Sequence, residues 1–182
     1  GHHTGISFDD LGASWIGESG FVGMAVSSYR SNYDIPGHAH EHHESELKEG
    51  EEEAPVRLDM DQTRIDLKAG LSTASRAAEN IRVRLGSNRY EHVELEGDKV
   101  GTRFANDELT GRIDVVHTEI AGWRGAYGLS FSERDFEAVG AEAFVPPSDT
   151  SQLGLFLVEN REIGAWNLEL GARYDSQQID TR

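Results

Sequence analysis

Apolar and polar residues alternate along most of this chain. In WNLELGARYD, residues 166–175, apolar residues occupy every second position, and polar residues or glycine fill the positions between. Because successive side chains of a β-strand point to opposite faces of its sheet, this pattern predicts a strand with one apolar and one polar face. Seven further stretches follow the same rule: 11–15, 22–26, 64–71, 81–86, 109–115, 127–132 and, less cleanly, 153–157.

The eight predicted strands leave little room for helices. Residues 74–80, ASRAAEN, are the one stretch that suggests a helix, and they are too few to form more than a turn. We therefore expect an all-β fold, an antiparallel up-and-down meander of about eight strands, within a single domain that covers residues 1–182.

The expected connections alternate in length along the chain. Short connections are expected at 17–20, 72–80, 119–123 and 160–166, and long polar ones at 33–56, 91–106 and 137–150. Every second connection of a meander lies at the same edge of the sheet, so the short turns share one edge and the long loops the other, as in outer-membrane β-barrels. Trp15, Trp123 and Trp166 lie beside short turns, where an aromatic girdle meets the membrane interface. The sequence predicts part of an outer-membrane β-barrel, with strands of about ten residues.

A soluble β-sandwich is the alternative, and it would bury the three tryptophans in its core. The polar positions of the strands argue against it, because they include close pairs of charges such as Arg82 with Arg84 and Asp66 with Lys68. In a dry core such charges are costly unless they are paired, whereas the water-filled interior of a barrel accepts them.

Composition narrows the function. The chain has 17 basic and 33 acidic residues, a net charge of −16 that opposes binding to nucleic acid. It has no cysteine, so histidine and carboxylate are the strong metal ligands that remain. The longest apolar run, Leu153 to Val158, is far shorter than the ~20 residues of a membrane helix. No phosphate loop or nucleophile motif is present, so we expect no enzyme activity.

Histidine and glutamate are concentrated in PGHAHEHHESELKEGEEEAP, residues 36–55, which contains four of the eight histidines. Neutral imidazole is a preferred ligand of zinc, and clustered carboxylates attract cations. His38, His40 and His42 lie two residues apart, so an extended backbone would direct all three to the same side. A solvated acidic loop with incidental histidines is the alternative, but His-rich tracts favour metal binding. The predicted ligands of zinc or another divalent metal are His38, His40, His42, His43, Glu41 and Glu44.

The remaining histidines are less informative. His2, His3 and His92 are expected at the same edge of the sheet as the 33–56 loop, with His92 opening the second long loop. His117 is in phase with Ile113 near a short turn, and we expect it to be an interfacial residue without a ligand role. A zinc-protease motif is excluded, because HEHHE has glutamate where HExxH requires its second histidine.

Several segments in order resemble the barrel of TonB-dependent outer-membrane receptors, of the zinc-uptake (ZnuD-like) type. They are SSYRSNYDIPGHAHEHHE, VRLDMDQTRIDLKAGL, SNRYEHVELEGDKVGTRFANDELTGRIDVVH, WRGAYGLSFSERDFEAVGAEAFVPPSDT and LELGARYD. The resemblance implies a Gram-negative outer-membrane protein with a plugged barrel of about 22 strands. It also implies zinc capture by the extracellular 33–56 loop and import driven by the TonB system. The plug domain and TonB box of the family have no counterpart here, so we expect an internal fragment of the barrel.

Three other functions fit the same pattern of strands. The barrel could belong to a receptor for haem or a siderophore, since such receptors differ in loops and interior more than in strands. A soluble periplasmic or extracellular metal-binding β-domain would fold without detergent. A small barrel with an adhesive or structural role would show no dependence on metal.

Overall fold

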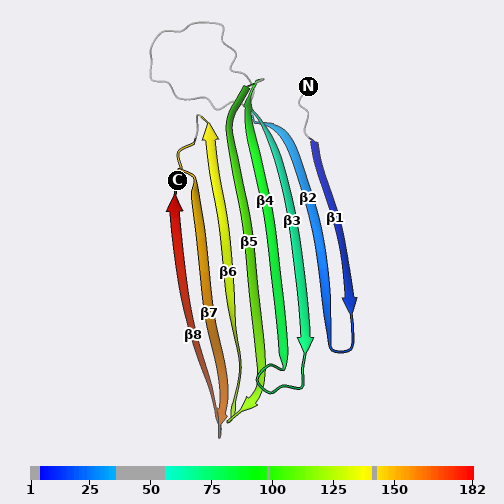
Figure 1. Cartoon of the computed structure of the whole chain (residues 1–182), viewed down its shortest axis with the longest axis vertical. Helices are drawn as coiled ribbons and strands as arrows, with labels where there is room; N and C mark the ends of the chain where they lie inside the picture. Colours follow the sequence, from blue (N-terminus) through cyan, green and yellow to red (C-terminus); the bar gives the residue numbers. More distant parts are fainter. Residues whose placement is uncertain (1–4, 36–55, 98, 141–142) are drawn as a thin grey trace.

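The computed structural model describes residues 5–35, 56–97, 99–140 and 143–182. They form one antiparallel sheet whose strands follow one another in chain order, so the predicted all-β meander is confirmed (Figure 1). The strands are β1 (Gly5–Ile16), β2 (Gly20–Ile35), β3 (Val56–Ser72), β4 (Asn80–Glu96), β5 (Lys99–Ile120), β6 (Trp123–Gly140), β7 (Ser148–Ile163) and β8 (Trp166–Thr181). Within these ranges no helix is long and apolar enough to cross a membrane.

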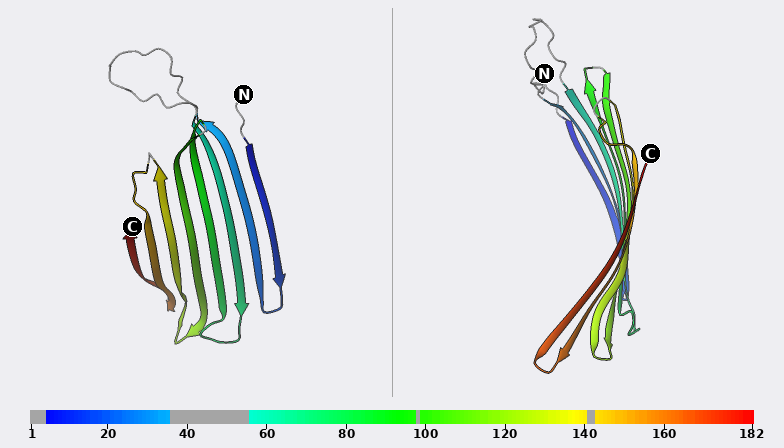
Figure 2. Two further views of the ribbon diagram at one scale, coloured as in Figure 1. Left: turned by 45° about the horizontal axis from the view of Figure 1, so that its top comes forward. Right: turned by 90° about the vertical axis from the view of Figure 1, so that its left-hand side faces the viewer.

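The sheet is a single layer with two uncovered faces. Figure 2 shows it bent and twisted along its length, with no second layer against either side. Strands β1 and β8 each pair with one neighbour and not with each other, so among the described residues the sheet is open. Leu58 and Ala138 are the only described hydrophobic side chains that are buried. This arrangement differs from a soluble sandwich, which requires a second sheet to form its core.

The strand register brings the alternating positions of all eight strands into agreement. Ile113 of β5 lies between Val83 of β4 and Leu129 of β6. One residue away, Arg84 and Arg112 lie opposite each other. Because neighbouring positions face opposite sides, the apolar residues share one face, called here the apolar face, and the charged residues between them share the polar face.

The connections lie at two edges of the sheet. The turn edge holds 17–19, 73–79, 121–122 and 164–165, and the loop edge holds 36–55, 97–98 and 141–147. The predicted long loop at 91–106 is wrong, because β4 and β5 continue to a two-residue connection. The loop predicted at 137–150 is shorter, and the strands have 12 to 22 residues instead of about ten. The strict sorting of connections by length does not hold.

The sequence does not predict the extended hairpin of β4 and β5 because its apolar residues do not keep to one face near the loop edge: Val93 and Leu95 lie on the apolar face and Phe104 on the polar face. The two strands nevertheless continue to pair through their backbones up to Glu96 and Lys99. This pairing supplies the hydrogen-bond partners that backbone N–H and C=O groups require. Side chains add to the pairing. Arg103 donates a hydrogen bond of 2.6 Å to Glu91 on one face, and the rings of His92 and Phe104 stack 4.5 Å apart on the other.

Three glycines lie beneath phenylalanine rings of neighbouring strands. The ring of Phe131 covers Gly111 on the apolar face. On the polar face, Phe21 covers Gly70 and Phe156 covers Gly128; a Cβ at any of the three glycines would overlap the ring. Each glycine thus leaves space that an aromatic ring from the adjacent strand fills, an arrangement that stabilises glycines within sheets.

The turn between β5 and β6 consists of two residues, both with positive φ. Ala121 has a φ of 55° and Gly122 of 84°, and they join the paired residues Ile120 and Trp123. Two positive φ angles define a type I′ turn, which suits the twist of a hairpin and favours Asn-Gly. Alanine is strained in this conformation because its Cβ lies close to the backbone.

We expect Ala121→Asn to raise the free energy of unfolding by about 0.5–1 kcal/mol, because asparagine tolerates positive φ better than alanine. The measurement is guanidinium unfolding of the detergent-folded chain followed by tryptophan fluorescence. The matched control is Ala165→Asn in the two-residue turn between β7 and β8, where the alanine is not at positive φ. Equal effects of the two substitutions would contradict the assignment of strain to Ala121.

Candidate functional site

An apolar band crosses all eight strands on the apolar face. Its members are exposed although they are large: Leu11 is 78% exposed, Leu155 49% and Leu170 51%. Isolated exposed apolar residues are common, but a continuous exposed surface of this extent indicates an interaction with a membrane or a partner. The band consists of every second residue in 11–15, 22–26, 65–71, 81–85, 109–115, 127–131, 153–157 and 166–174.

The band is longest on β8, where it runs from Trp166 to Tyr174, about 26 Å along the strand at ~3.3 Å per residue. At the tilt of ~40° that barrel strands have, this length spans about 20 Å of height. Outer-membrane barrels have an apolar band ~25 Å tall. The tryptophans Trp15, Trp123 and Trp166 lie on the apolar face close to the turn edge. They therefore occupy the position predicted for an interfacial girdle at this edge.

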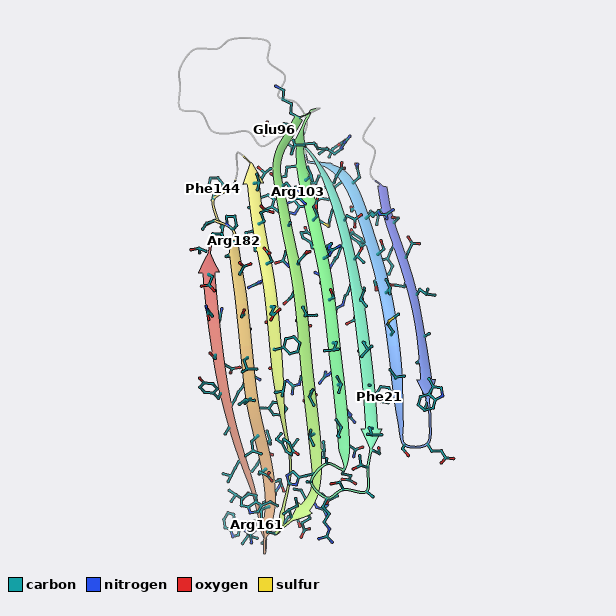
Figure 3. All side chains as sticks on the ribbon, in the orientation of Figure 1. Phe21, Glu96, Arg103, Phe144, Arg161 and Arg182 are labelled. Atoms are coloured by element: carbon teal, nitrogen blue, oxygen red, sulfur yellow. The ribbon has the colours of Figure 1, made fainter. Side chains whose placement is uncertain are left out.

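Above the band, toward the loop edge, the apolar face becomes charged. Arg30 pairs with Asp61 at 3.1 Å, and Arg182 pairs with Asp135 at 2.6 Å and Asp149 at 3.0 Å. Further pairs of this charged belt are Arg57–Asp59, Arg89–Asp107 and Arg103–Glu91. Figure 3 shows Arg103 and Arg182 toward the loop edge and Arg161 at the turn edge. The belt sets a sharp polar boundary to the apolar band.

The opposite face carries a cluster of charges at the level of the band, called here the basic strip. It contains six cations and three carboxylates on β3, β4, β5 and β8. Arg84 lies between Val83 and Leu85 of the band but points to the other face. The strip consists of Arg64, Lys68, Arg82, Arg84, Arg112, Arg173, Asp66, Asp114 and Asp175.

Ion pairs organise the strip around its carboxylates. Asp114 accepts hydrogen bonds from Arg84 and Arg112, both at 2.8 Å, and its side chain is only 16% exposed. Arg112 also lies 4.6 Å above the centre of the Phe156 ring, a cation–π contact that holds the guanidinium against the sheet. Asp66 pairs with Arg64, and Asp175 with Arg173, each through two hydrogen bonds.

A second polar cluster lies on the apolar face near the turn edge. Nε2 of His117 is 2.9 Å from Glu159, and Nδ1 is 2.7 Å from the carbonyl of Thr118. His117 is in β5 and Glu159 in β7, and Gly125 of the intervening strand β6 lies between them. A side chain at Gly125 would overlap the Glu159 carboxylate. His117 is 7% exposed and is a buried partner of Glu159, a pairing that the prediction of an interfacial residue without a ligand role did not include.

His92 lies on the polar face beyond the level of the band. It is part of strand β4, which corrects its predicted position at the opening of a loop. Its Nδ1 is 3.0 Å from the hydroxyl of Tyr90, and its ring stacks on Phe104. Burial lowers the pKa of His92, so the ring is neutral near pH 7. On the other face, the hydrogen bond from Arg103 lowers the pKa of Glu91.

The predicted metal ligands lie outside the described residues. His38, His40, His42, His43, Glu41 and Glu44 all belong to the connection between Ile35 and Val56. The ends of β2 and β3 place the start and finish of this connection side by side at the loop edge. In the part of the chain that the structure describes, no group of three or more histidine, aspartate or glutamate side chains has the geometry of a metal site.

Comparison with protein families gives no assignment, because no family model matches this chain. The resemblance to TonB-dependent receptors therefore stays a prediction from the sequence. The features that any function has to explain are the apolar band, the charged belt above it and the basic strip behind it.

We expect Asp114→Asn to lower the free energy of unfolding by about 1–3 kcal/mol, because it weakens charged hydrogen bonds to two arginines at once. Denaturant unfolding in detergent micelles is the measurement. Asp175→Asn is the matched control, since Asp175 pairs with one arginine and is well exposed. If the control is as destabilised as Asp114→Asn, Asp114 does not organise the strip.

Proposed function

We propose that this chain forms part of the wall of an outer-membrane β-barrel in a Gram-negative bacterium. The barrel belongs to a TonB-dependent receptor that captures and imports a divalent metal, most simply zinc. The observation that carries the proposal is the two-faced single-layer sheet. A continuous apolar band that crosses all eight strands lies on one face, and a charged strip lies directly behind it on the other.

The two faces have different roles in this proposal. The apolar face contacts outer-membrane lipid along the band, with the tryptophans at the turn edge in the membrane interface. The charged belt lies among the polar headgroups on the loop side. The polar face lines a wet interior, where charges remain hydrated or paired. A soluble β-domain would expose the band to water. Exposure of so many large leucines to water is unfavourable.

Metal capture is the role proposed for residues 36–55. The support is chemical: four histidines and seven glutamates stand in one connection that leaves the sheet at the loop edge, beyond the charged belt. Gated import requires a plug and energy from the TonB system, which we assign to parts of the receptor other than this sheet. No catalytic role is proposed.

The lipid-facing role predicts that Leu155→Arg lowers the free energy of unfolding in phospholipid vesicles by about 2–4 kcal/mol, because it places a charge in the hydrocarbon. Urea unfolding in vesicles followed by tryptophan fluorescence measures the change. Gln152→Arg is the control, because it adds the same side chain to the same strand on the polar face. A larger loss for Gln152→Arg than for Leu155→Arg would mean that the apolar face is not the one in lipid.

The metal-capture role predicts zinc binding that depends on the four histidines of residues 36–55. Calorimetry on the detergent-folded chain should show binding at about pH 7.5 and weaker binding at about pH 5.5, where histidine with a pKa of ~6.5 is mostly protonated. Changing His38, His40, His42 and His43 to alanine should abolish the binding, whereas His92→Ala should leave it unchanged. Zinc binding that survives in the fourfold variant would refute this role.

A further inference from the structure

A hollow interrupts the apolar face close to the turn edge, where β5, β6, β7 and β8 run side by side. Its volume is about 550 Å³, and its walls are mostly apolar. The lining includes Trp123, Leu157, Leu170 and Ala172, together with the pair of His117 and Glu159. Both leucines are exposed, so the hollow opens toward the medium that the apolar face contacts.

An unpaired cation lies at the turn-edge end of this hollow. Arg161 of β7 is on the same face as Glu159 and two residues nearer the turn edge (Figure 3). Its guanidinium lies 5.5 Å from the centre of the Trp123 ring and close to Gly122 in the turn between β5 and β6. Glu159 is bound to His117, and within the described ranges Arg161 forms no ion pair. Its hydrogen-bond donors are therefore available to a group outside the sheet.

The position of Arg161 suits the phosphate of a lipid headgroup. The cation–π contact with Trp123 holds the guanidinium in place, and guanidinium binds phosphate oxygens through two parallel hydrogen bonds. In the proposed barrel Trp123 lies at the membrane interface, which is the depth of the headgroups. The hollow lies on the hydrocarbon side of Arg161. A single phospholipid therefore reaches both features, with its phosphate at the arginine and an acyl chain in the hollow.

We propose that Arg161, Trp123 and the adjoining hollow form a binding site for one phospholipid of the membrane leaflet on the turn side. This inference rests on the proposed barrel, since it takes the apolar face to contact lipid. It goes beyond general contact of the band with lipid, because an unpaired cation and an apolar hollow are adjacent here. Arg124 at the same edge differs, since it lies on the polar face and pairs with Glu119 at 3.6 Å.

The test measures contact between Trp123 and a brominated phospholipid, because bromine quenches tryptophan fluorescence on contact. The full chain is folded in dodecyl maltoside micelles with the substitutions Trp15→Phe and Trp166→Phe, which leave Trp123 as the reporter. The probe is phosphatidylcholine with dibrominated acyl chains, and the reference is dodecyl maltoside brominated on its own chain. We expect the phospholipid to half-quench Trp123 at a mole fraction about tenfold lower than the reference does, because it alone carries a phosphate.

Two variants separate the headgroup from the acyl chain. Arg161→Gln should raise the half-quenching mole fraction of the phospholipid about tenfold and leave that of the brominated detergent unchanged. Its control, Arg124→Gln, removes a cation from the same edge on the other face and should behave as the parent does. Ala172→Phe fills the hollow while Arg161 keeps its place on Trp123, and it should also weaken phospholipid binding. Ala13→Phe adds the same ring to the band on β1 and should not.

Three outcomes overturn the inference: equal half-quenching fractions for phospholipid and detergent, equal shifts in Arg161→Gln and Arg124→Gln, or an Ala172→Phe variant that binds as the parent does. Circular dichroism and heat-dependent gel mobility establish that each variant is folded. The detergent reference separates this inference from the proposed function. If both amphiphiles quench Trp123 equally, the apolar face contacts lipid-like chains, and the barrel wall stands without a specific site. If neither quenches it, the lipid-facing role fails as well.

Discussion

The structure depends on the fact that a one-layer sheet satisfies its backbone hydrogen bonds but covers neither of its faces. In a sandwich, one face of each sheet is covered by the other sheet; here each face has to be compatible with its surroundings unaided. The apolar face requires a medium that accepts leucine and tryptophan, and the polar face requires one that accepts arginine and aspartate. A bilayer on one side and water on the other is a medium of that kind, and closure with further strands would also remove the free edges of β1 and β8.

Alternation along the chain was enough to predict the number of strands, their order and the two faces, because apolar and polar residues alternate regularly along most of each strand. It failed where the apolar residues do not keep to one face. Val93 and Leu95 lie on the apolar face of β4 but Phe104 of β5 lies on the polar face, so the pattern of residues 91–106 does not predict a hairpin. The pair of His117 and Glu159 was also beyond prediction, since it forms across the intervening Gly125 and depends on the register of three strands. The ligand assignment in 36–55 rests on composition alone.

The distribution of charge is as specific as that of apolar residues. The net charge of −16 describes the whole chain poorly, because acidic residues are concentrated in 36–55 and on the apolar face above the band, while cations prevail behind the band. A strand that alternates between lipid and water can hold a cation only on its wet side. Each arginine of the basic strip is therefore held on the polar face by an apolar neighbour on at least one side, as Arg84 is by Val83 and Leu85.

The phenylalanine rings that lie on glycines have a consequence for strand assembly. A slip of one residue between neighbouring strands would exchange their faces, and the apolar pattern alone opposes that error. A slip of two residues keeps every side chain on its face, so the apolar pattern does not oppose it. It would, however, move Phe131 from Gly111 onto Ile113 or Leu109, where a side chain already fills the space. The glycine and phenylalanine pairs therefore discriminate against the even-numbered register errors that hydrophobic patterning does not detect.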